Sequence, residues 1–329
     1  MKVLVTGATG FLGKYILEEL KEHSYDVIAV GRNQEIGEGL VAEGISFVKA
    51  DFTNYKELEN AFAKGPDLVV HAGALSTVWG KWRDFYETNV KATEYVLRLC
   101  RKYAVKRMVY ISSPSIYAFG KDQIGIREYT PKHNDLNFYI RSKLMAERKI
   151  KDCPQVETVI LRPRGLIGIG DTSIIPRVLR ISRKIGVPLL NGGKQLVDLT
   201  CVENVALAVR LALESPAAAG QIYNITNDEP REFKRILDEF LREMGIRPRY
   251  LKVNATSLYY LAVFLEKVYR TLHIYKEPMF TRYSYYLLRY SQTLNIEKAK
   301  MELGYHPKLS LSEGIAQYAR HERKQSDTH

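Results

Sequence analysis

The chain opens with a short apolar run that leads into three spaced glycines. Residues 2–13 read KVLVTGATGFLG, and an amphipathic helical pattern begins at residue 12. Gly7 lets the chain turn sharply, Gly10 lets the backbone approach a pyrophosphate, and Gly13 lets a helix pack closely on the strand. The helix N-terminus offers unpaired N–H groups to phosphates. This order predicts a strand–turn–helix unit that binds a dinucleotide, with a glycine-rich turn without ligand as the alternative.

Apolar strand-like runs alternate with helical patterns through the first half of the chain. The runs are 3–5, 27–30, 45–48, 68–70, 108–111 and 156–161, and the longest helical patterns are 85–103 and 137–152. Repeated β–α units predict an α/β fold, a Rossmann-type doubly wound parallel sheet with helices on both faces. Ligands of such sheets bind beyond the carboxyl ends of the strands.

The pattern changes after Arg162-Pro163-Arg164, where glycine and proline interrupt the strands. We expect residues 1–165 and 200–227 to form the NAD(P)-binding domain. Residues 166–199 and 228–329 are expected to form a smaller, mostly helical lobe that covers the substrate. This second lobe is rich in tyrosine.

Composition narrows the class of protein. The net charge is +12, but the basic residues are spread without a run of five, so we expect no nucleic-acid partner. The three cysteines, Cys100, Cys153 and Cys201, are unclustered, which predicts a reducing compartment without disulfides or a metal site. No secretory signal is recognised, and the longest apolar stretch, 258–265, is far shorter than the roughly 20 residues of a spanning helix. We expect a cytoplasmic protein.

The end of the second strand bears on the choice of cofactor. NAD sites usually have an acidic residue here that accepts from the ribose 2′-hydroxyl, but this chain reads Gly31-Arg32-Asn33. The Arg32 guanidinium can pair with a 2′-phosphate, so NADP(H) is predicted, with NAD(H) as the alternative. Asp51 follows the third strand and is placed to accept from the adenine amino group. An aspartate that caps a turn would look the same.

Tyr139 and Lys143 are four residues apart in a predicted helix, so they share a face. A nearby ammonium is expected to lower the phenol pKa from its usual value near 10 and make Tyr139 an acid–base group. Ser113 follows a predicted strand and could bond both the substrate oxygen and Tyr139. Ser112 and Ser115 are competing candidates, because serines at strand ends often cap turns. A surface Tyr/Lys pair is the alternative for this pattern alone.

Together these motifs resemble those of extended short-chain dehydrogenases/reductases. The resemblance covers almost the whole chain and rests on 6–13 (TGATGFLG), Asp51, 71–74 (HAGA), Asn89, 112–117, Tyr139 with Lys143, and Arg162-Pro163. The family pattern implies a catalytic set of Asn89, Ser113, Tyr139 and Lys143. It implies cofactor contacts from Gly7, Thr9, Gly10, Phe11, Leu12, Gly13, Arg32, Asp51, Phe52, Ala72, Gly73, Ala74, Tyr139, Lys143 and Pro163. Gly73 departs from the commoner alanine, which we expect a small-residue passage to tolerate.

Within the family, the chain is most similar to the 3β-hydroxysteroid dehydrogenase branch, which includes ketoreductases of bacterial olefin biosynthesis. The similarity rests on Trp79-Gly80, 113–115 (SPS), 162–165 (RPRG) and 168–172 (GIGDT). Sugar-nucleotide epimerases usually carry an arginine before the aspartate of a later strand, where it holds a diphosphate. Here the matching dipeptide is Val197-Asp198, although Arg177 or Arg180 could substitute.

The resulting prediction is an NADP(H)-dependent enzyme that interconverts a ketone and a secondary alcohol by hydride transfer, with Tyr139 as the acid–base group. The runner-up is a nucleotide-sugar epimerase or dehydratase with tightly bound NAD. A non-catalytic cofactor sensor is a third hypothesis, disfavoured because Ser113, Tyr139 and Lys143 are all present.

Residues 257–272 are apolar on nearly all sides for two turns, which favours a steroid-, lipid- or aryl-like substrate under a covering helix. Packing in a domain core or a dimer interface is the alternative. A third use is peripheral contact with a membrane surface, helped by Lys267, Arg270 and Lys276. The family habit predicts a homodimer.

Overall fold

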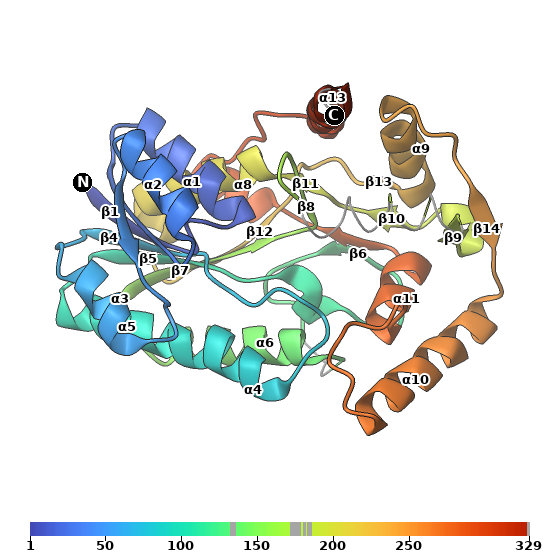
Figure 1. The fold of residues 1–329 in the computed structure, drawn as a ribbon, viewed down its shortest axis with the longest axis horizontal. Helices are drawn as coiled ribbons and strands as arrows, with labels where there is room; N and C mark the ends of the chain where they lie inside the picture. Colours follow the sequence, from blue (N-terminus) through green and yellow to red (C-terminus); the bar gives the residue numbers. More distant parts are fainter. Residues whose placement is uncertain (132–135, 172–178, 180–181, 183–185, 328–329) are drawn as a thin grey trace.

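The core of the protein is a seven-stranded sheet in the order β12-β7-β5-β4-β1-β2-β3. A computed structural model describes residues 1–131, 136–171, 179, 182 and 186–327 (Figure 1). All neighbouring strands in this sheet are parallel, which confirms the predicted Rossmann-type fold. The strands are β1 (Lys2–Thr6), β2 (Asp26–Gly31), β3 (Ser46–Lys49), β4 (Leu68–His71), β5 (Arg107–Ile111), β7 (Glu157–Pro163) and β12 (Ile222–Ile225).

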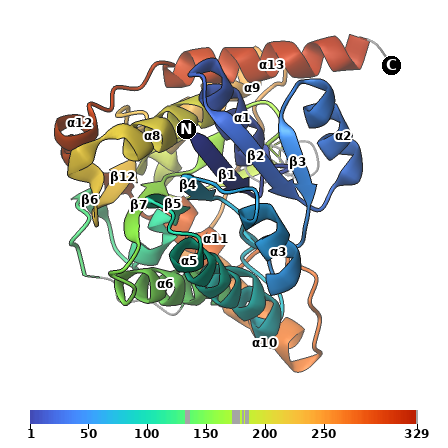
Figure 2. The same cartoon turned by 90° about the vertical axis from the view of Figure 1, so that its left-hand side faces the viewer.

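Helices cover both faces of this sheet, as Figures 1 and 2 show. Side chains alternate along each strand, so Val3 and Val5 enter one hydrophobic core and Leu4 enters the other. The first core is closed by α1 (Phe11–Glu22), α2 (Gln34–Ala42), α8 (Val202–Glu214) and α12 (Glu297–Leu303). The second is closed by α3 (Tyr55–Phe62), α5 (Ala92–Lys102) and α6 (Phe138–Lys151).

The helical pattern predicted for residues 85–103 is not one regular α-helix. It is divided into the end of α4 (Trp82–Phe85), a π-helical segment η1 (Tyr86–Lys91) and α5. π-Helical turns widen a helix locally and are frequent at functional sites. The turn places Asn89 inside the protein, where 1% of its surface is exposed.

A second group of elements lies beyond the carboxyl ends of the strands. It contains a four-stranded sheet in the order β13-β10-β15-β6, two short strand pairs and further helices. Its strands are β6 (Gln123–Ile126), β8 (Leu166–Ile167), β9 (Val187–Leu189), β10 (Leu196–Val197), β11 (Thr200–Cys201), β13 (Arg231–Glu232), β14 (Tyr250–Lys252) and β15 (Gln292–Leu294). Its helices are η2 (Pro114–Tyr117), η3 (Asn191–Gly193), α9 (Phe233–Glu243), α10 (Ala255–Thr271), α11 (Arg282–Arg289) and α13 (Leu311–Asp327). The short helix η4 (Pro216–Ala218) instead packs into the first core of the main sheet through Ala218.

The boundaries of the two expected lobes stay a prediction. Strand β12 returns to the main sheet, and Ile296, Leu303 and Tyr305 pack into the core under α1 and α8. The chain therefore crosses between the two groups of elements several times. This crossing follows from the order of the strands, because β12, which comes late in the sequence, pairs with β7 at one edge of the main sheet.

Three further facts concern the part of the chain that the structure describes. Cys100, Cys153 and Cys201 are free thiols. The described histidine, cysteine and acidic residues form no group of three or more that could hold a metal ion. Within the described ranges, every helix is too short or too polar to cross a membrane.

Candidate active site

The glycine turn after β1 has room only for glycine. Gly7 has a φ of 71°, and a Cβ added there would lie 2.7 Å from the Cα of Gly73. A Cβ on Gly13 would lie 2.2 Å from the carbonyl oxygen of Gly7. Gly10 precedes α1 and brings no capping side chain to the first turn of the helix, so the approach to its N–H groups is open. This cradle fits the pyrophosphate of a dinucleotide.

The other residues expected around the cofactor lie at the ends of the sheet strands and at the start of α1. Phe11 begins α1 and lies against the loop at Gly170, where an added Cβ would be 3.7 Å from its ring. Leu12 and Ala72 pack partly against the core. Ala74 follows β4, and Pro163 is buried at the end of β7.

Gly73 is required by packing against Phe52. A Cβ added to Gly73 would lie 2.7 Å from the Phe52 ring, which also packs edge-on against His71. The departure from the commoner alanine is therefore matched to a large neighbour, Phe52, from the segment after β3. The His71 imidazole is bonded to Thr6 and Thr93, and burial lowers its pKa to about 3, so it is neutral.

Arg32 and Asp51, the two charged residues predicted at the adenine end of the cofactor site, lie close together. The Arg32 side chain is 74% exposed, and its Nη1 lies 3.6 Å from Asp51 Oδ2. Asp51 Oδ1 also accepts from the Thr53 N–H at 2.9 Å, so this aspartate holds a turn as well. A Cβ on Gly31 would lie 2.5 Å from the Thr9 side chain. Thr9 thus occupies the space beside the end of β2.

Ser113 and Tyr139 meet at the carboxyl end of β5. The Ser113 side chain acts on the Tyr139 phenol, and its effect opposes the burial that raises the pKa of Tyr139 to about 12. Ser112 instead donates to Glu147 at 2.6 Å, and Ser115 is bonded to Ser113 at 2.9 Å. Of the three serine candidates, Ser113 is the one that contacts the tyrosine.

Lys143 is buried on the same helix but is bonded elsewhere. Its Nζ donates to the Tyr110 hydroxyl at 3.2 Å and to the Ile111 carbonyl at 2.8 Å. Burial lowers the pKa of Lys143 to about 7, against the opposing effect of Glu147. The expected lowering of the Tyr139 pKa is wrong, because burial raises this pKa by more than Ser113 lowers it.

Asn89 connects the loop after β4 to helix α6 by hydrogen bonds from its side chain. Its Oδ1 accepts from the Leu75 N–H at 2.7 Å, and its Nδ2 donates to the Leu75 carbonyl and to Ser142 Oγ at 3.0 and 2.9 Å. Ser142 Oγ in turn donates to the Tyr139 carbonyl at 2.7 Å. These contacts assign Asn89 the role of holding the backbone of the loop after β4.

A buried ion pair behind these residues was not foreseen from the sequence. Arg162 at the end of β7 donates from Nε and Nη2 to the two carboxylate oxygens of Glu147, at 2.8 and 2.6 Å. Its Nη1 donates to the Tyr117 hydroxyl and, at 3.0 Å, to the Glu128 carbonyl. The available signal was Glu147 itself, a carboxylate four residues after Lys143 on the same helix face.

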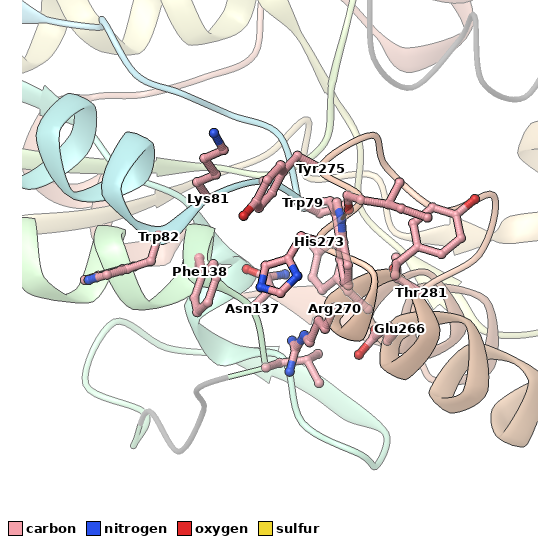
Figure 3. Close-up of a pocket in the computed structure, with 16 residues that line it drawn as sticks. Trp79, Lys81, Trp82, Asn137, Phe138, Glu266, Arg270, His273, Tyr275 and Thr281 are labelled. Atoms are coloured by element: carbon pink, nitrogen blue, oxygen red, sulfur yellow. Dashed lines mark hydrogen bonds between the residues drawn. The ribbon is translucent and has the colours of Figure 1, made fainter.

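A cavity of about 350 Å³ is lined by Asn137 and Phe138, the two residues that precede Tyr139 in the chain (Figure 3). Phe138 lines it and packs against Trp82, with ring centroids 5.6 Å apart. Trp79 lines it too, edge-on to Tyr269, and its Nε1 donates to the Ile274 carbonyl just after α10. The end of α10 therefore covers this cavity.

The start of α10 behaves differently from its end. Tyr260, Leu261 and Phe264 are 66, 45 and 62% exposed. The helix therefore combines a covering role with an exposed apolar surface.

Val197 ends β10, and Asp198 follows it directly. Asp198 is buried, accepts from the Leu294 N–H at 2.6 Å, and has its pKa raised to about 6 by burial. Arg177 and Arg180, the possible replacements for the epimerase arginine, lie outside the described residues.

The buried Lys143 predicts a pH-dependent contribution to stability. Its folded pKa of about 7 is below its unfolded value of 10.5, so the unfolded chain binds the extra proton between these values. Relative to Lys143→Met, wild-type unfolding free energy should rise from pH 7 to 10, by up to about 1.4 kcal/mol per pH unit. Urea titrations of both proteins measure this difference. Lys149→Met, at an exposed lysine of α6, should give a flat difference, and a flat difference at Lys143 would contradict the assignment.

Comparisons with known proteins agree with this geometry. Residues 3–226 match the NAD dependent epimerase/dehydratase family. The chain is 33% identical to a 2-alkyl-3-oxoalkanoate reductase of Shewanella oneidensis, over 94% of this chain and 84% of that protein. It is 28% identical to mouse sterol-4-alpha-carboxylate 3-dehydrogenase, decarboxylating, over 95% and 89%. UDP-glucose 4-epimerase of Thermotoga maritima shares the fold, with a TM-score of 0.78, 21% identity, and coverage of 99% and 100%.

The family match spans most of the chain, and the named relatives by sequence are reductases and dehydrogenases. The chain therefore belongs to the NAD-dependent epimerase/dehydratase family, the extended short-chain dehydrogenases/reductases, and is an NAD(P)-dependent oxidoreductase.

Proposed function

We propose that the protein interconverts a ketone and a secondary alcohol on an apolar substrate, with NADP(H) as its preferred cofactor. The observation that carries this proposal is the action of Ser113 on the Tyr139 phenol, on a helix whose Phe138 lines an aromatic cavity. The single carboxylate among the described lining residues, Glu266, is bonded to the backbone and side chain of Arg282. The cavity thus suits an apolar skeleton better than a sugar nucleotide.

The chemistry follows from the two hydroxyls and the lysine. A bound nicotinamide supplies or accepts the hydride. In the reductive direction Tyr139 donates its proton to the developing alkoxide, and Ser113 donates a hydrogen bond to the same oxygen. Lys143, one turn along α6, supplies in its protonated form a buried positive charge that favours the tyrosinate left behind.

The names of two relatives support the substrate class. The Shewanella reductase is named for a 2-alkyl-3-oxoalkanoate, and the mouse dehydrogenase for a sterol-4-alpha-carboxylate. Both names describe an apolar skeleton with a carboxylate on the carbon next to the reacting one. We carry over to this chain the apolar skeleton and the reaction at a ketone or secondary alcohol.

The end of β2 supports NADP(H). Gly31 brings no carboxylate to the ribose 2′ position, and Thr9 fills the adjacent space. Arg32 stays mostly exposed, so its guanidinium is available to a 2′-phosphate. The Asp51 carboxylate 3.6 Å away fixes the guanidinium near the strand end.

The epimerase hypothesis remains the alternative. It requires NAD to stay bound through turnover, so purified protein carrying one NAD per chain would favour it.

The homodimer, the cytoplasmic location and peripheral membrane contact remain predictions. The exposed apolar residues at the start of α10, Tyr260, Leu261 and Phe264, are the surface on which a dimer or membrane contact would depend.

Tyr139→Phe tests the acid–base assignment. The variant should bind NADPH with a Kd within about twofold of wild type but lose roughly 100-fold or more in kcat with a steroid or 3-keto ester substrate. NADPH fluorescence titration and NADPH absorbance measure the two quantities. Tyr260→Phe, on the exposed face of α10, is the matched control and should keep wild-type kcat. Wild-type kcat in Tyr139→Phe would show that another group moves the proton.

Arg32→Ala tests the cofactor choice. Wild type should have a higher kcat/KM with NADPH than with NADH, and the variant should lose roughly 10- to 100-fold of it with NADPH alone. Arg235→Ala, at an exposed arginine of α9, should change neither value. Equal or better use of NADH by wild type would contradict NADP(H) preference.

A further inference from the structure

Helix α10 is rich in apolar residues, yet little of it is buried. Of its 17 residues, Ala262 and Glu266 alone are buried. The helix packs mainly against α11, where the ring centroids of Tyr259 and Tyr285 lie 5.3 Å apart. Figures 1 and 2 both draw α10 at the edge of the molecule. An amphipathic helix of a globular protein usually turns its apolar side chains toward a core, whereas this one leaves many of them in water.

The exposed apolar side chains of α10 are concentrated on one face. Tyr260, Leu261 and Phe264 share this face because residues three and four positions apart are neighbours on a helix. Among the described residues, seven of the fifteen large apolar side chains that are exposed lie between positions 260 and 279. Such a concentration marks a contact surface, unlike apolar residues exposed singly. We call it the α10 patch, and it consists of Tyr260, Leu261, Phe264, Leu272, Ile274, Tyr275 and Met279.

The surroundings of the α10 patch are basic. Residues 247–282 contain seven lysine or arginine residues and two glutamates. One of these glutamates, Glu266, is buried and bonded to Arg282. Lys267 and Lys276 are exposed and have no acidic partner among the described residues. Apolar side chains flanked by unpaired cations match the surface of a bilayer that contains anionic lipids.

The same charge disfavours a second copy of the chain as the occupant of the patch. Two identical chains mostly bring the same surface of each copy together around a two-fold axis. That arrangement would place the cations around the patch, Lys267 and Lys276 among them, near those of the other copy. Like charges that face each other across an interface are unfavourable. A bilayer with anionic lipids brings the opposite charge instead.

We propose that the α10 patch docks the protein on the surface of an anionic membrane, with the cavity turned toward the lipid. Phe264 and Leu261 enter the boundary between headgroups and acyl chains, while Lys267 pairs with lipid phosphates. Ile274 and Tyr275 belong to the patch and also line the cavity. An apolar molecule dissolved in the bilayer then reaches the cavity without transfer through water. Docking is measured without substrate, so the inference stands independently of the proposed reaction.

Co-sedimentation with vesicles tests the docking. At low salt, wild type should bind phosphatidylcholine vesicles containing about one third phosphatidylglycerol at least roughly tenfold more tightly than vesicles of phosphatidylcholine alone. Phe264→Ser should weaken binding to the anionic vesicles roughly 10- to 100-fold, because it removes an inserted ring. Met301→Ser, at a side chain of α12 that is 77% exposed, is the matched control and should bind as wild type does.

A second pair of variants tests the charge. Lys267→Gln should weaken binding to the anionic vesicles roughly fivefold, the contribution of one cation near the lipid surface. Lys56→Gln, at an exposed lysine of α3, should leave binding unchanged. Added salt should weaken wild-type binding, because it screens the attraction between the cations and the lipid phosphates.

The orientation of the cavity has its own readout. Both tryptophans of the chain, Trp79 and Trp82, line the cavity, and Trp79 is bonded to Ile274 of the patch. Vesicles with brominated acyl chains, which quench tryptophan at short range, should therefore lower the emission of wild type relative to vesicles without bromine. Phe264→Ser should show much less of this quenching at the same lipid concentration, because less of it is bound.

The outcomes that would overturn the proposal are distinct. Wild type that does not bind anionic vesicles at low salt would exclude the membrane, and unchanged binding in both Phe264→Ser and Lys267→Gln would exclude the α10 patch. Binding without quenching would overturn the proposed orientation. Dimers in analytical ultracentrifugation that Phe264→Ser abolishes, without vesicle binding, would identify a second copy as the occupant. The ketone reaction is tested separately by Tyr139→Phe, so it stands or falls on other results.

Discussion

The active site depends on one buried ion pair, Glu147 of α6 with Arg162 of β7. Both side chains are almost completely shielded from water, and two parallel hydrogen bonds fix their relative orientation. Removing either partner would leave an uncompensated buried charge, which destabilises a fold by roughly 3–5 kcal/mol. Because Glu147 lies one and two turns after Lys143 and Tyr139, the same pair fixes the rotation of α6 against the sheet. Ser112 also donates to Glu147, so the end of β5, with Ser113 next in sequence, is held to the same carboxylate.

The cofactor half of the candidate site and the proposed substrate half differ in kind. The cofactor half is built from backbone that approaches backbone, where Gly7, Gly13 and Gly73 leave no space for a side chain. The proposed substrate half is lined mainly by aromatic side chains. Its one carboxylate among the described lining residues, Glu266, is bonded to Arg282. A turn without side chains positions a rigid phosphate group, whereas an aromatic wall accepts apolar skeletons of varied shape. This division agrees with an NAD dependent family whose relatives are named for different substrates.

The parts of the site that were predictable from sequence are those set by local spacing. Three glycines in one turn, or Tyr139 and Lys143 on one helix face, need only neighbouring residues. The choice of Ser113 over its neighbours needed the tertiary structure, because each of the three serines is bonded to a different or additional group. The pair of Glu147 with Arg162 joins a helix to a strand, and the contact of Trp79 with the segment after α10 joins residues 195 apart in sequence. No local pattern encodes such contacts. The Tyr139 pKa was predicted in the wrong direction for the same reason, since burial is a property of the whole fold.

The central claim is that this site transfers a hydride to an apolar ketone and releases the resulting alcohol. The most direct measurement supplies NADPH deuterated at the transferable C4 position, with an apolar 3-keto ester, and analyses the product by mass spectrometry. The account predicts one deuterium on the carbinol carbon of the product and a primary isotope effect on turnover. Absence of deuterium from every ketone product, together with inversion of a UDP-sugar by the same protein, would contradict the account and identify an epimerase.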